Sequence, residues 1–163
     1  MSIRPFTGLD ETTLRALLEQ WPVARLGTAS RSGQPHLVPI VFCAHDGVVY
    51  SPLDGKRKRP GRLKRFTNLA ENPSASLLLD MYDADWQQLW WVRIDGEAQW
   101  CEPGEALART VAERLLDKYP QYRSTELSFN REGYLRFSTA RVSFWSQSGS
   151  VTPLRQALDQ AGS

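Results

Sequence analysis

The sequence has few of the residues and motifs on which disulfide, metal or membrane function depends. Its 163 residues include two cysteines and two histidines, and no run approaches the roughly 20 apolar residues of a membrane span. The amino-terminal segment lacks the apolar core of a signal peptide. Two cysteines far apart in the chain are typical of free thiols in a reducing compartment. We therefore expect a cytoplasmic protein without a membrane segment.

Sequence motifs of several catalytic classes are also missing. His36 and His45 have no Cys, Asp or Glu at ligand spacing, so no metal site is expected. No serine lies in a GxSxG elbow, and neither GxGxxG nor a Walker sequence occurs. The spacing of His36 indicates a packing or hydrogen-bonding residue sooner than a catalytic one. No catalytic acid, base or nucleophile is predicted, so any reaction is expected to depend on a bound cofactor.

Length and composition indicate one ordinary globular domain. The chain is 41% hydrophobic and 23% charged, and its formal net charge of +2 does not by itself imply a polyanionic partner. A length of 163 residues suits one compact domain. No repeat or low-complexity linker divides the sequence, so we predict a single domain over residues 1–163.

The first third of the chain changes from a helical to a strand-like pattern. Leucines three and four residues apart predict a helix that begins after Asp10 and ends at Trp21-Pro22. Residues 23–51 then have the pattern of a three-stranded antiparallel meander, with a hairpin at Asp46-Gly47. The long middle strand of this meander is expected to run over residues 35–45.

Two prolines mark one side of that middle strand. Pro35 and Pro39 have no backbone N–H and cannot donate to a neighbouring strand. One side of the strand is therefore expected to face a ligand or the edge of a sheet.

The rest of the chain predicts further strands and helices. Apolar stripes at helical spacing predict helices within residues 60–72 and over 104–119. Patterns of period two predict strands at 74–82, 89–100 and 134–146. The tail from Val151 is expected to be a short helix or a loose end. Together these elements predict a mainly β fold, a split β-barrel of about six to seven antiparallel strands, Greek-key in type, with two principal helices.

The predicted strand at 89–100 contains two informative features. Gly96 lies inside it and is expected to mark a β-bulge. Trp90 and Trp91 are adjacent and must point to opposite faces of the strand. One of them is therefore expected to face a partner subunit, a helix or a ligand.

A run of basic residues between a predicted strand and a predicted helix departs most from the average composition. Seven cations lie within ten residues: Lys56, Arg57, Lys58, Arg59, Arg62, Lys64 and Arg65. A helix N-terminus has free N–H groups and the positive end of the helix dipole, and both favour phosphate. Ser51 and the Asp54-Gly55 turn add a hydroxyl and backbone donors. The run therefore predicts a site for a phosphate-bearing small ligand.

Two other interpretations of the basic run remain open. It is either a solvated basic face or a patch that binds nucleic acid. Nucleic-acid binders usually spread cations over a face and interleave aromatic residues, whereas no aromatic residue occurs in this run before Phe66. We therefore expect a small-molecule ligand and no nucleic-acid partner.

The motifs in combination resemble a known family. The segment VARLGTASRSGQPHLVPIVFCAHDGVVYSP, the basic residues and NLAENPSASLLLD are similar to the pyridoxamine 5′-phosphate oxidase-like split-barrel flavoproteins, over roughly residues 15–145. The stretches SPLDGKRKR and DADWQQLWWVRIDGEA resemble the actinobacterial branch that depends on the deazaflavin coenzyme F420. The resemblance implies a homodimer with the cofactor at the subunit interface.

The resemblance also implies which residues bind the cofactor. The backbone of the second strand would lie along the ring system, and the end of the third strand would contribute a hydroxyl to the phosphate. The phosphate-gripping pair of the family falls on Lys64 and Arg65, which we expect to lie away from the apolar stripe of their helix. The basic insertion departs from the family pattern and leaves room for a more anionic cofactor than FMN. The implied residues are Pro35, His36, Leu37, Val38, Tyr50, Ser51, Lys56, Lys58, Lys64 and Arg65.

The prediction for function is an oxidoreductase that transfers a hydride between coenzyme F420 and a small organic substrate. One alternative is an FMN-dependent oxidoreductase of the same family, and another is a non-catalytic flavin or deazaflavin carrier protein. The substrate-binding Arg and His of the true pyridoxamine phosphate enzymes have no counterpart near the C-terminus. That reaction is therefore not predicted.

Overall fold

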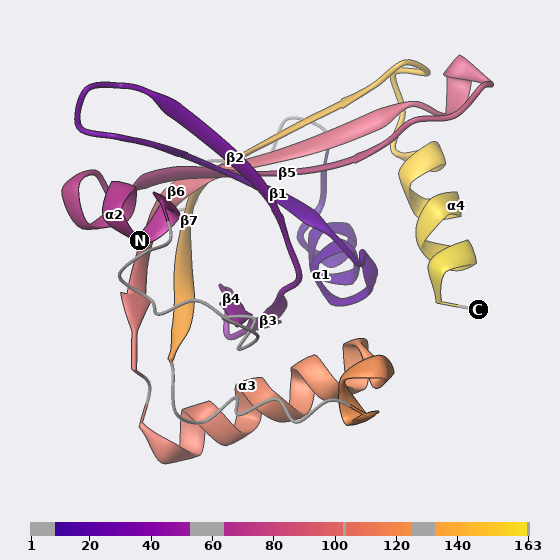
Figure 1. Cartoon of the computed structure of the whole chain (residues 1–163). Helices are drawn as coiled ribbons and strands as arrows, with labels where there is room; N and C mark the ends of the chain where they lie inside the picture. Colours follow the sequence, from indigo (N-terminus) through magenta and orange to yellow (C-terminus); the bar gives the residue numbers. More distant parts are fainter. Residues whose placement is uncertain (1–8, 53–63, 103, 125–132, 163) are drawn as a thin grey trace.

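The computed structural model describes residues 9–52, 64–102, 104–124 and 133–162. Seven antiparallel strands of this part form one sheet in the order β2-β1-β5-β6-β7-β4-β3, so the sheet is open between β2 and β3 (Figure 1). The strands are β1 (Ala24–Ala29), β2 (Pro35–Ile40), β3 (Cys43–His45), β4 (Val48–Pro52), β5 (Ser74–Met81), β6 (Trp90–Cys101) and β7 (Tyr134–Ser146). The helices are α1 (Glu11–Gln20), α2 (Lys64–Glu71), α3 (Glu105–Lys118) and α4 (Thr152–Ala161), with short 3₁₀ turns η2 (Trp86–Gln88) and η3 (Pro120–Ser124). The mainly β, antiparallel split-barrel prediction is confirmed.

The predicted three-stranded meander is wrong in one respect. The run 35–45 is not one strand: it divides into β2 and β3, which lie at opposite edges of the sheet. The break falls at Phe42, whose side chain is fully buried. The hydroxyl of Tyr119 lies 3.0 Å from both the amide nitrogen and the carbonyl oxygen of Phe42. A distant side chain thus satisfies the backbone that a continuous strand would have paired with a neighbour.

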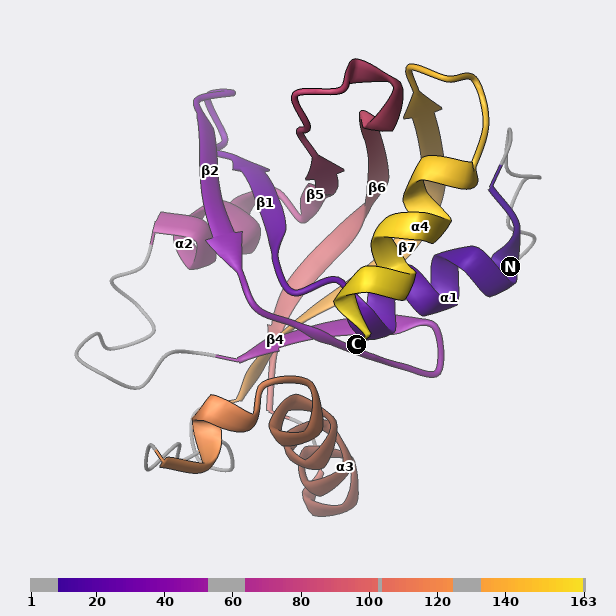
Figure 2. The ribbon, with the colours of Figure 1, turned by 90° about the vertical axis from the view of Figure 1, so that its right-hand side faces the viewer.

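The amino-terminal helix forms as predicted, and the carboxy-terminal tail packs against it. Asp10 caps α1 by accepting hydrogen bonds from the amide and hydroxyl of Thr13, both at 2.8 Å. Arg155 of α4 donates to the same carboxylate at 2.7 Å. These contacts, with those from Thr13 first, lower the pKa of Asp10 to about 2. Figure 2 shows α4 beside α1, so the tail is a docked helix.

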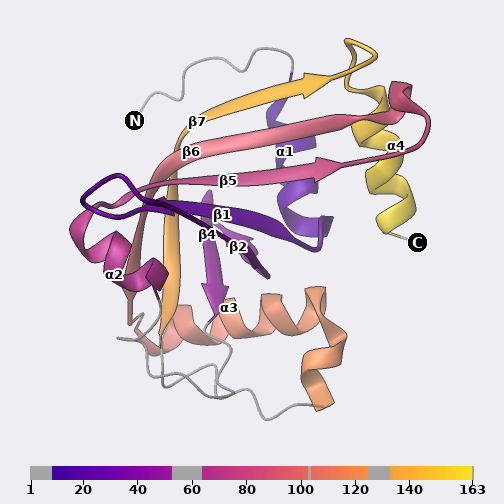
Figure 3. The same cartoon turned by 45° about the horizontal axis from the view of Figure 1, so that its top comes forward.

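The long strands β6 and β7 turn midway along their length, as Figure 3 shows. Their register shifts between Asp95 and Gly96, which confirms the predicted bulge. A Cβ on Gly96 would lie 2.0 Å from the carbonyl oxygen of Ser138, so no larger residue fits there without a shift of the backbone. The glycine therefore allows the close approach of the two strands at the bend.

Two apolar clusters support the sheet. The larger one lies between the strands and the helices α1 and α4, and it includes fully buried Leu17, Leu77 and Leu154. The smaller one lies beneath α3 and includes Cys43, Tyr50 and Tyr134. Both cysteines are free thiols. No helix in the described ranges is long and apolar enough to cross a membrane.

Candidate functional site

The outer edge of β2 presents backbone groups that no strand among the described residues pairs. The amide of Ser30 donates to the carbonyl of Gln34 at 3.0 Å, which fixes the alternation of bonded pairs along the β1–β2 ladder. By that alternation His36 and Val38 direct their backbone groups toward β1. Pro35, Leu37 and Pro39 direct theirs away from it. The outer edge therefore offers the single N–H of Leu37 among three carbonyl groups, and the prediction that one side of this strand meets an edge is confirmed.

The side chains behind this edge form a polar corner between β1, β2 and α2. Asn68 of α2 is fully buried, and its Nδ2 donates to the hydroxyl of Thr28 at 3.1 Å. Thr28 lies opposite His36 in the ladder. Asn68 Oδ1 and His36 Nδ1 are both buried, and neither has a hydrogen-bond partner among the described residues. Buried polar atoms are nearly always paired, so two such atoms in one corner point to a ligand that binds there.

The first turn of α2 brings two cations of the basic run to the same helix. Lys64 is exposed, whereas Arg65 is half-buried. The guanidinium carbon of Arg65 lies 5.4 Å from the centroid of the Phe66 ring, and burial lowers the pKa of Arg65. Arg65 was expected to lie away from the apolar stripe, but it packs against the aromatic residue of that stripe. Lys56 and Lys58 lie outside the described residues.

The two residues expected from β4 point to opposite faces of that strand. Tyr50 packs with Cys43 and Tyr134 in the cluster beneath α3. Ser51 is also buried but lies on the other face of β4, next to Leu135 of β7 in the ladder. The structure thus places the His36 side chain on the same face as Thr28, the β1 residue that contacts α2, and places the Tyr50 side chain with α3.

Sequence reasoning missed Thr28 and Asn68. Asn68 opens the NLAENP segment, which was used to recognise the family and the end of the helix. A buried asparagine cannot be told from an exposed one in a helix of eight residues without knowing what packs on it. Among the described residues, no group of three or more His, Cys, Asp or Glu side chains is placed to hold a metal ion.

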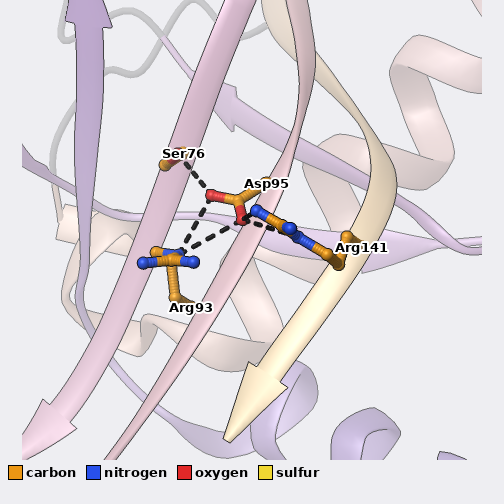
Figure 4. Close-up of polar contacts among 4 residues, drawn as sticks. All are labelled: Ser76, Arg93, Asp95 and Arg141. Carbon is orange, nitrogen blue, oxygen red and sulfur yellow. Dashed lines mark hydrogen bonds and ion pairs between the residues drawn. The ribbon is translucent and has the colours of Figure 1, made fainter. Parts of the chain in front are cut away.

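The outer face of β5, β6 and β7 carries a charged network, shown in Figure 4. Asp95 accepts hydrogen bonds from Ser76 at 2.7 Å, from Arg141 at 2.9 Å and from Arg93 at 3.2 Å. Burial raises the pKa of Asp95, but the Ser76 hydrogen bond and the two guanidinium groups outweigh it, so the pKa is lowered. Asp95 is therefore ionised, and the two arginines neutralise its charge while the three residues link neighbouring strands.

Aromatic side chains lie on the same outer face, beyond the charged network. Trp91 and Trp145 stack with their ring centroids 6.4 Å apart, and Trp145 is 41% exposed. Trp90 is buried, as expected for one of two adjacent residues of a strand. Tyr82 and Trp86, near the end of β5, are 77% and 63% exposed. The stacked and partly exposed pair of Trp91 and Trp145 is the part of this outer face suited to contact a partner.

Comparison with known proteins identifies a family and its fold. The sequence profile described as pyridoxamine 5′-phosphate oxidase matches residues 11–146. No curated protein matches the sequence. Among solved structures, the conserved hypothetical protein Rv2991 of Mycobacterium tuberculosis is similar with a TM-score of 0.68 at 21% identity, covering 90% of each chain.

Two further solved structures share the fold, but one is a heme storage protein and the other a FAD-binding protein. HutZ, the heme storage protein of Vibrio cholerae, has a TM-score of 0.62 at 13% identity, covering 86% of this chain and 96% of its own. A FAD-binding protein of Mesorhizobium loti has a TM-score of 0.58 at 20% identity, covering 83% of this chain and 94% of its own.

Proposed function

The chain belongs to the pyridoxamine 5′-phosphate oxidase family, and from that premise we propose that it is a cytoplasmic oxidoreductase that binds coenzyme F420 at the corner between β1, β2 and α2. In this proposal it transfers a hydride between the deazaflavin and a small organic substrate. The coenzyme, when bound, supplies two-electron hydride chemistry. The residues of the chain bind the ring, orient it and exclude water from it.

The observation that carries the proposal is the hydrogen-bonding pattern of the β2 edge. A flavin or deazaflavin ring has an edge on which one N–H lies between two carbonyl groups. The outer edge of β2 offers one donor and one acceptor to this ring edge, since the N–H of Leu37 can donate to a ring carbonyl while the carbonyl of Leu37 accepts from the ring N–H. An edge of this composition is poorly suited to pair with another strand, because two of its three outward residues have no N–H to donate.

The polar corner behind the edge supports the same assignment. His36 Nδ1 and Asn68 Oδ1 are buried groups without partners among the described residues. The amide oxygen accepts a hydrogen bond from a ligand, and the imidazole nitrogen accepts or donates one according to its tautomer. Lys64 and Arg65 begin the helix that carries Asn68, so an anionic group bound there would meet two cations. We propose that these cations bind the cofactor phosphate together with Ser51. Lys56 and Lys58 of the insertion would then bind the remaining anionic tail.

We also propose that the protein is a homodimer that closes this site. The outer face of β5, β6 and β7 offers the stacked Trp91 and Trp145 beside the Asp95 network, and a second copy would cover this aromatic surface. Arg93 and Arg141 of this face are paired with Asp95 but keep further exposed N–H groups, which would donate to acceptors of the second copy across a twofold axis.

Two alternatives stay within the same family. FMN is the first, because it bears the same ring edge and a phosphate. A non-catalytic carrier is the second, and it is favoured by the shared fold of a protein described as storing heme. Neither alternative changes the residues proposed to hold the ring.

Equilibrium titration of the purified protein with F420 and with FMN tests the proposal. We expect F420 to bind at least tenfold more tightly than FMN, and reduced F420 to be oxidised when a panel of conjugated organic acceptors is added. Tighter binding of FMN would establish the first alternative. Tight F420 binding without turnover of any acceptor would favour the carrier. Failure of both cofactors to bind would overturn the assignment of the site.

A further inference from the structure

A pocket lies away from the β2 corner, between α1, β3 and α3. It has a volume of about 300 Å³, at the lower end of the range for small-molecule sites. Residues from all three elements line it: Leu18, Glu19, Cys43, Ala44, Arg114, Asp117 and Lys118. None of them belongs to the proposed cofactor site, so the inference does not depend on that proposal.

Lys118 is unusual both in the sequence and in its surroundings. The chain contains sixteen arginines but four lysines, and the other three lysines lie in the basic run at Lys56, Lys58 and Lys64. The Nζ of Lys118 donates to the carbonyl oxygen of Leu18 at 2.8 Å and lies 3.6 Å from the centroid of the Phe42 ring. Among the described residues no carboxylate lies within ion-pair distance of this amine. An arginine in its place would keep the charge but would have no nucleophilic amine.

The groups around this amine leave it without a counter-charge. Burial lowers the pKa of Lys118 to about 7, against the opposing effects of Cys43 and Glu19. Burial also raises the pKa of the Cys43 thiol to about 11, so the thiol is neutral at physiological pH. Its Sγ donates to the carbonyl of Val111 at 3.8 Å. Glu19 lies at the exposed rim of the pocket.

The remaining charges in the pocket favour a small anion beside the amine. Arg114 is exposed and donates through Nη1 to the carbonyl of Ala44 at 3.3 Å, which leaves most of its N–H groups available. Asp117 is paired with Arg123 at 3.4 Å instead. A guanidinium with free donors binds a carboxylate in bidentate fashion.

We propose that Lys118 is a carbonyl-reactive amine that condenses with a small α-keto or aldehydic acid, whose carboxylate is bound by Arg114. The Nζ lone pair attacks the carbonyl carbon, and a C–N bond forms. The carbonyl oxygen then leaves as water with the two hydrogens of the amine, so that C=N replaces C=O. No oxidant or reductant is needed, and water reverses the step.

Reductive trapping tests this proposal on the full-length protein. The protein is incubated at pH 7.5 with glyoxylate and cyanoborohydride, and the modified lysines are located by peptide mass spectrometry. We expect modification of Lys118 to exceed that of the exposed Lys64 by at least tenfold, because burial lowers the pKa of the Lys118 amine and Arg114 binds the carboxylate beside it. Equal modification of the two residues would overturn the proposal.

A matched aldehyde without a carboxylate tests the role of Arg114. In the wild-type protein, glyoxylate should modify Lys118 at least fivefold faster than acetaldehyde does at equal concentration, after correction for their rates with a free lysine amine. In Arg114→Gln, which keeps the amine, this preference should disappear. A preference that survives in Arg114→Gln, or that is absent in the wild type, would overturn the assignment of the keto-acid class. Lys118→Arg serves as the control that abolishes the adduct while keeping the cation.

Discussion

Asn68 of α2 donates its side-chain Nδ2 to the hydroxyl of Thr28 at 3.1 Å, while its Oδ1 lies buried without a partner among the described residues. This hydrogen bond links α2 to β1, the strand that pairs with β2. It therefore joins the helix that carries Lys64 and Arg65 to the edge that carries Leu37. A side chain with one amide atom bound within the fold and the other without a partner among the described residues is suited to bind both the neighbouring strand and a ligand.

Replacement of Asn68 by alanine should weaken both stability and cofactor binding. Loss of the bond to Thr28 leaves a buried hydroxyl unsatisfied, so the free energy of unfolding should fall by about 1–3 kcal/mol. Affinity for F420 should also fall, since Oδ1 is removed. Thr67→Ala, on the exposed side of the same helix, should change the free energy of unfolding by less than about 0.5 kcal/mol. Urea denaturation measures the free energy of unfolding, and titration measures the affinity for F420. Equal results for Asn68→Ala and Thr67→Ala would show that the Asn68 side chain contributes to neither.

Neutralising the first two cations of α2 should reduce cofactor affinity without unfolding the protein. Glutamine is the suitable replacement, because Arg65 is half-buried against Phe66 and a carboxylate there would be costly. Each charge-assisted hydrogen bond to phosphate contributes about 1.5–3 kcal/mol, so Lys64→Gln with Arg65→Gln should lower affinity at least about a hundredfold.

The circular-dichroism spectrum of that double variant should remain native. Arg31→Gln, in the turn between β1 and β2, removes one exposed cation elsewhere and serves as the charge control. If the double variant bound F420 with wild-type affinity, Lys64 and Arg65 would not be the phosphate site, and other residues of the basic run would have to bind the phosphate.

The aromatic outer face should determine the oligomeric state. Trp145→Glu places a carboxylate in the stacked pair with Trp91 and should convert the dimer to a monomer in sedimentation-velocity experiments at micromolar concentration. Gln160→Glu, an exposed change of equal charge on α4, should leave the dimer intact. A wild-type monomer, or a dimer that tolerates Trp145→Glu, would contradict the proposed interface.

The buried amine of Lys118 should make stability rise with pH above neutrality. In the folded protein its pKa is about 7, whereas in the unfolded chain it is near 10.5, so between these values the unfolded state holds the extra proton. The free energy of unfolding should therefore increase from pH 7 to 9 in the wild type relative to Lys118→Met. Urea denaturation of both proteins at several pH values measures the difference. Parallel pH profiles would show that the amine is not perturbed by burial.

The local sequence pattern was sufficient to predict most helices, strands and turns, but it did not predict which strands pair in the sheet. The Asp46-Gly47 hairpin, the Asp10 cap and the Gly96 bulge each depend on backbone conformations that their own residues dictate, and all three are present. The separation of β2 from β3 depends on Tyr119, which is 77 residues from Phe42 in sequence. Sequence periodicity contains no information about such a contact.

The candidate site likewise has features that the sequence predicted and features that depend on tertiary packing. The missing N–H groups of Pro35 and Pro39 were visible in the sequence and correctly indicated a strand edge. The unsatisfied atoms of His36 and Asn68 were not visible, because their burial depends on how α2 packs on β1. Arg65 was misplaced for the same reason, since its half-burial depends on how α2 packs on the sheet.

The most direct test of the cofactor site compares two replacements of Leu37. Leu37→Pro removes the single outward N–H of β2 without removing a bond to β1, while Leu37→Ala removes the 74% exposed side chain and keeps that N–H. Fluorescence titration with F420 should give roughly three- to tenfold weaker binding for Leu37→Pro than for Leu37→Ala, the value of one amide hydrogen bond, with native circular-dichroism spectra for both. Equal affinities in two folded variants would contradict the claim that the β2 edge binds the cofactor ring.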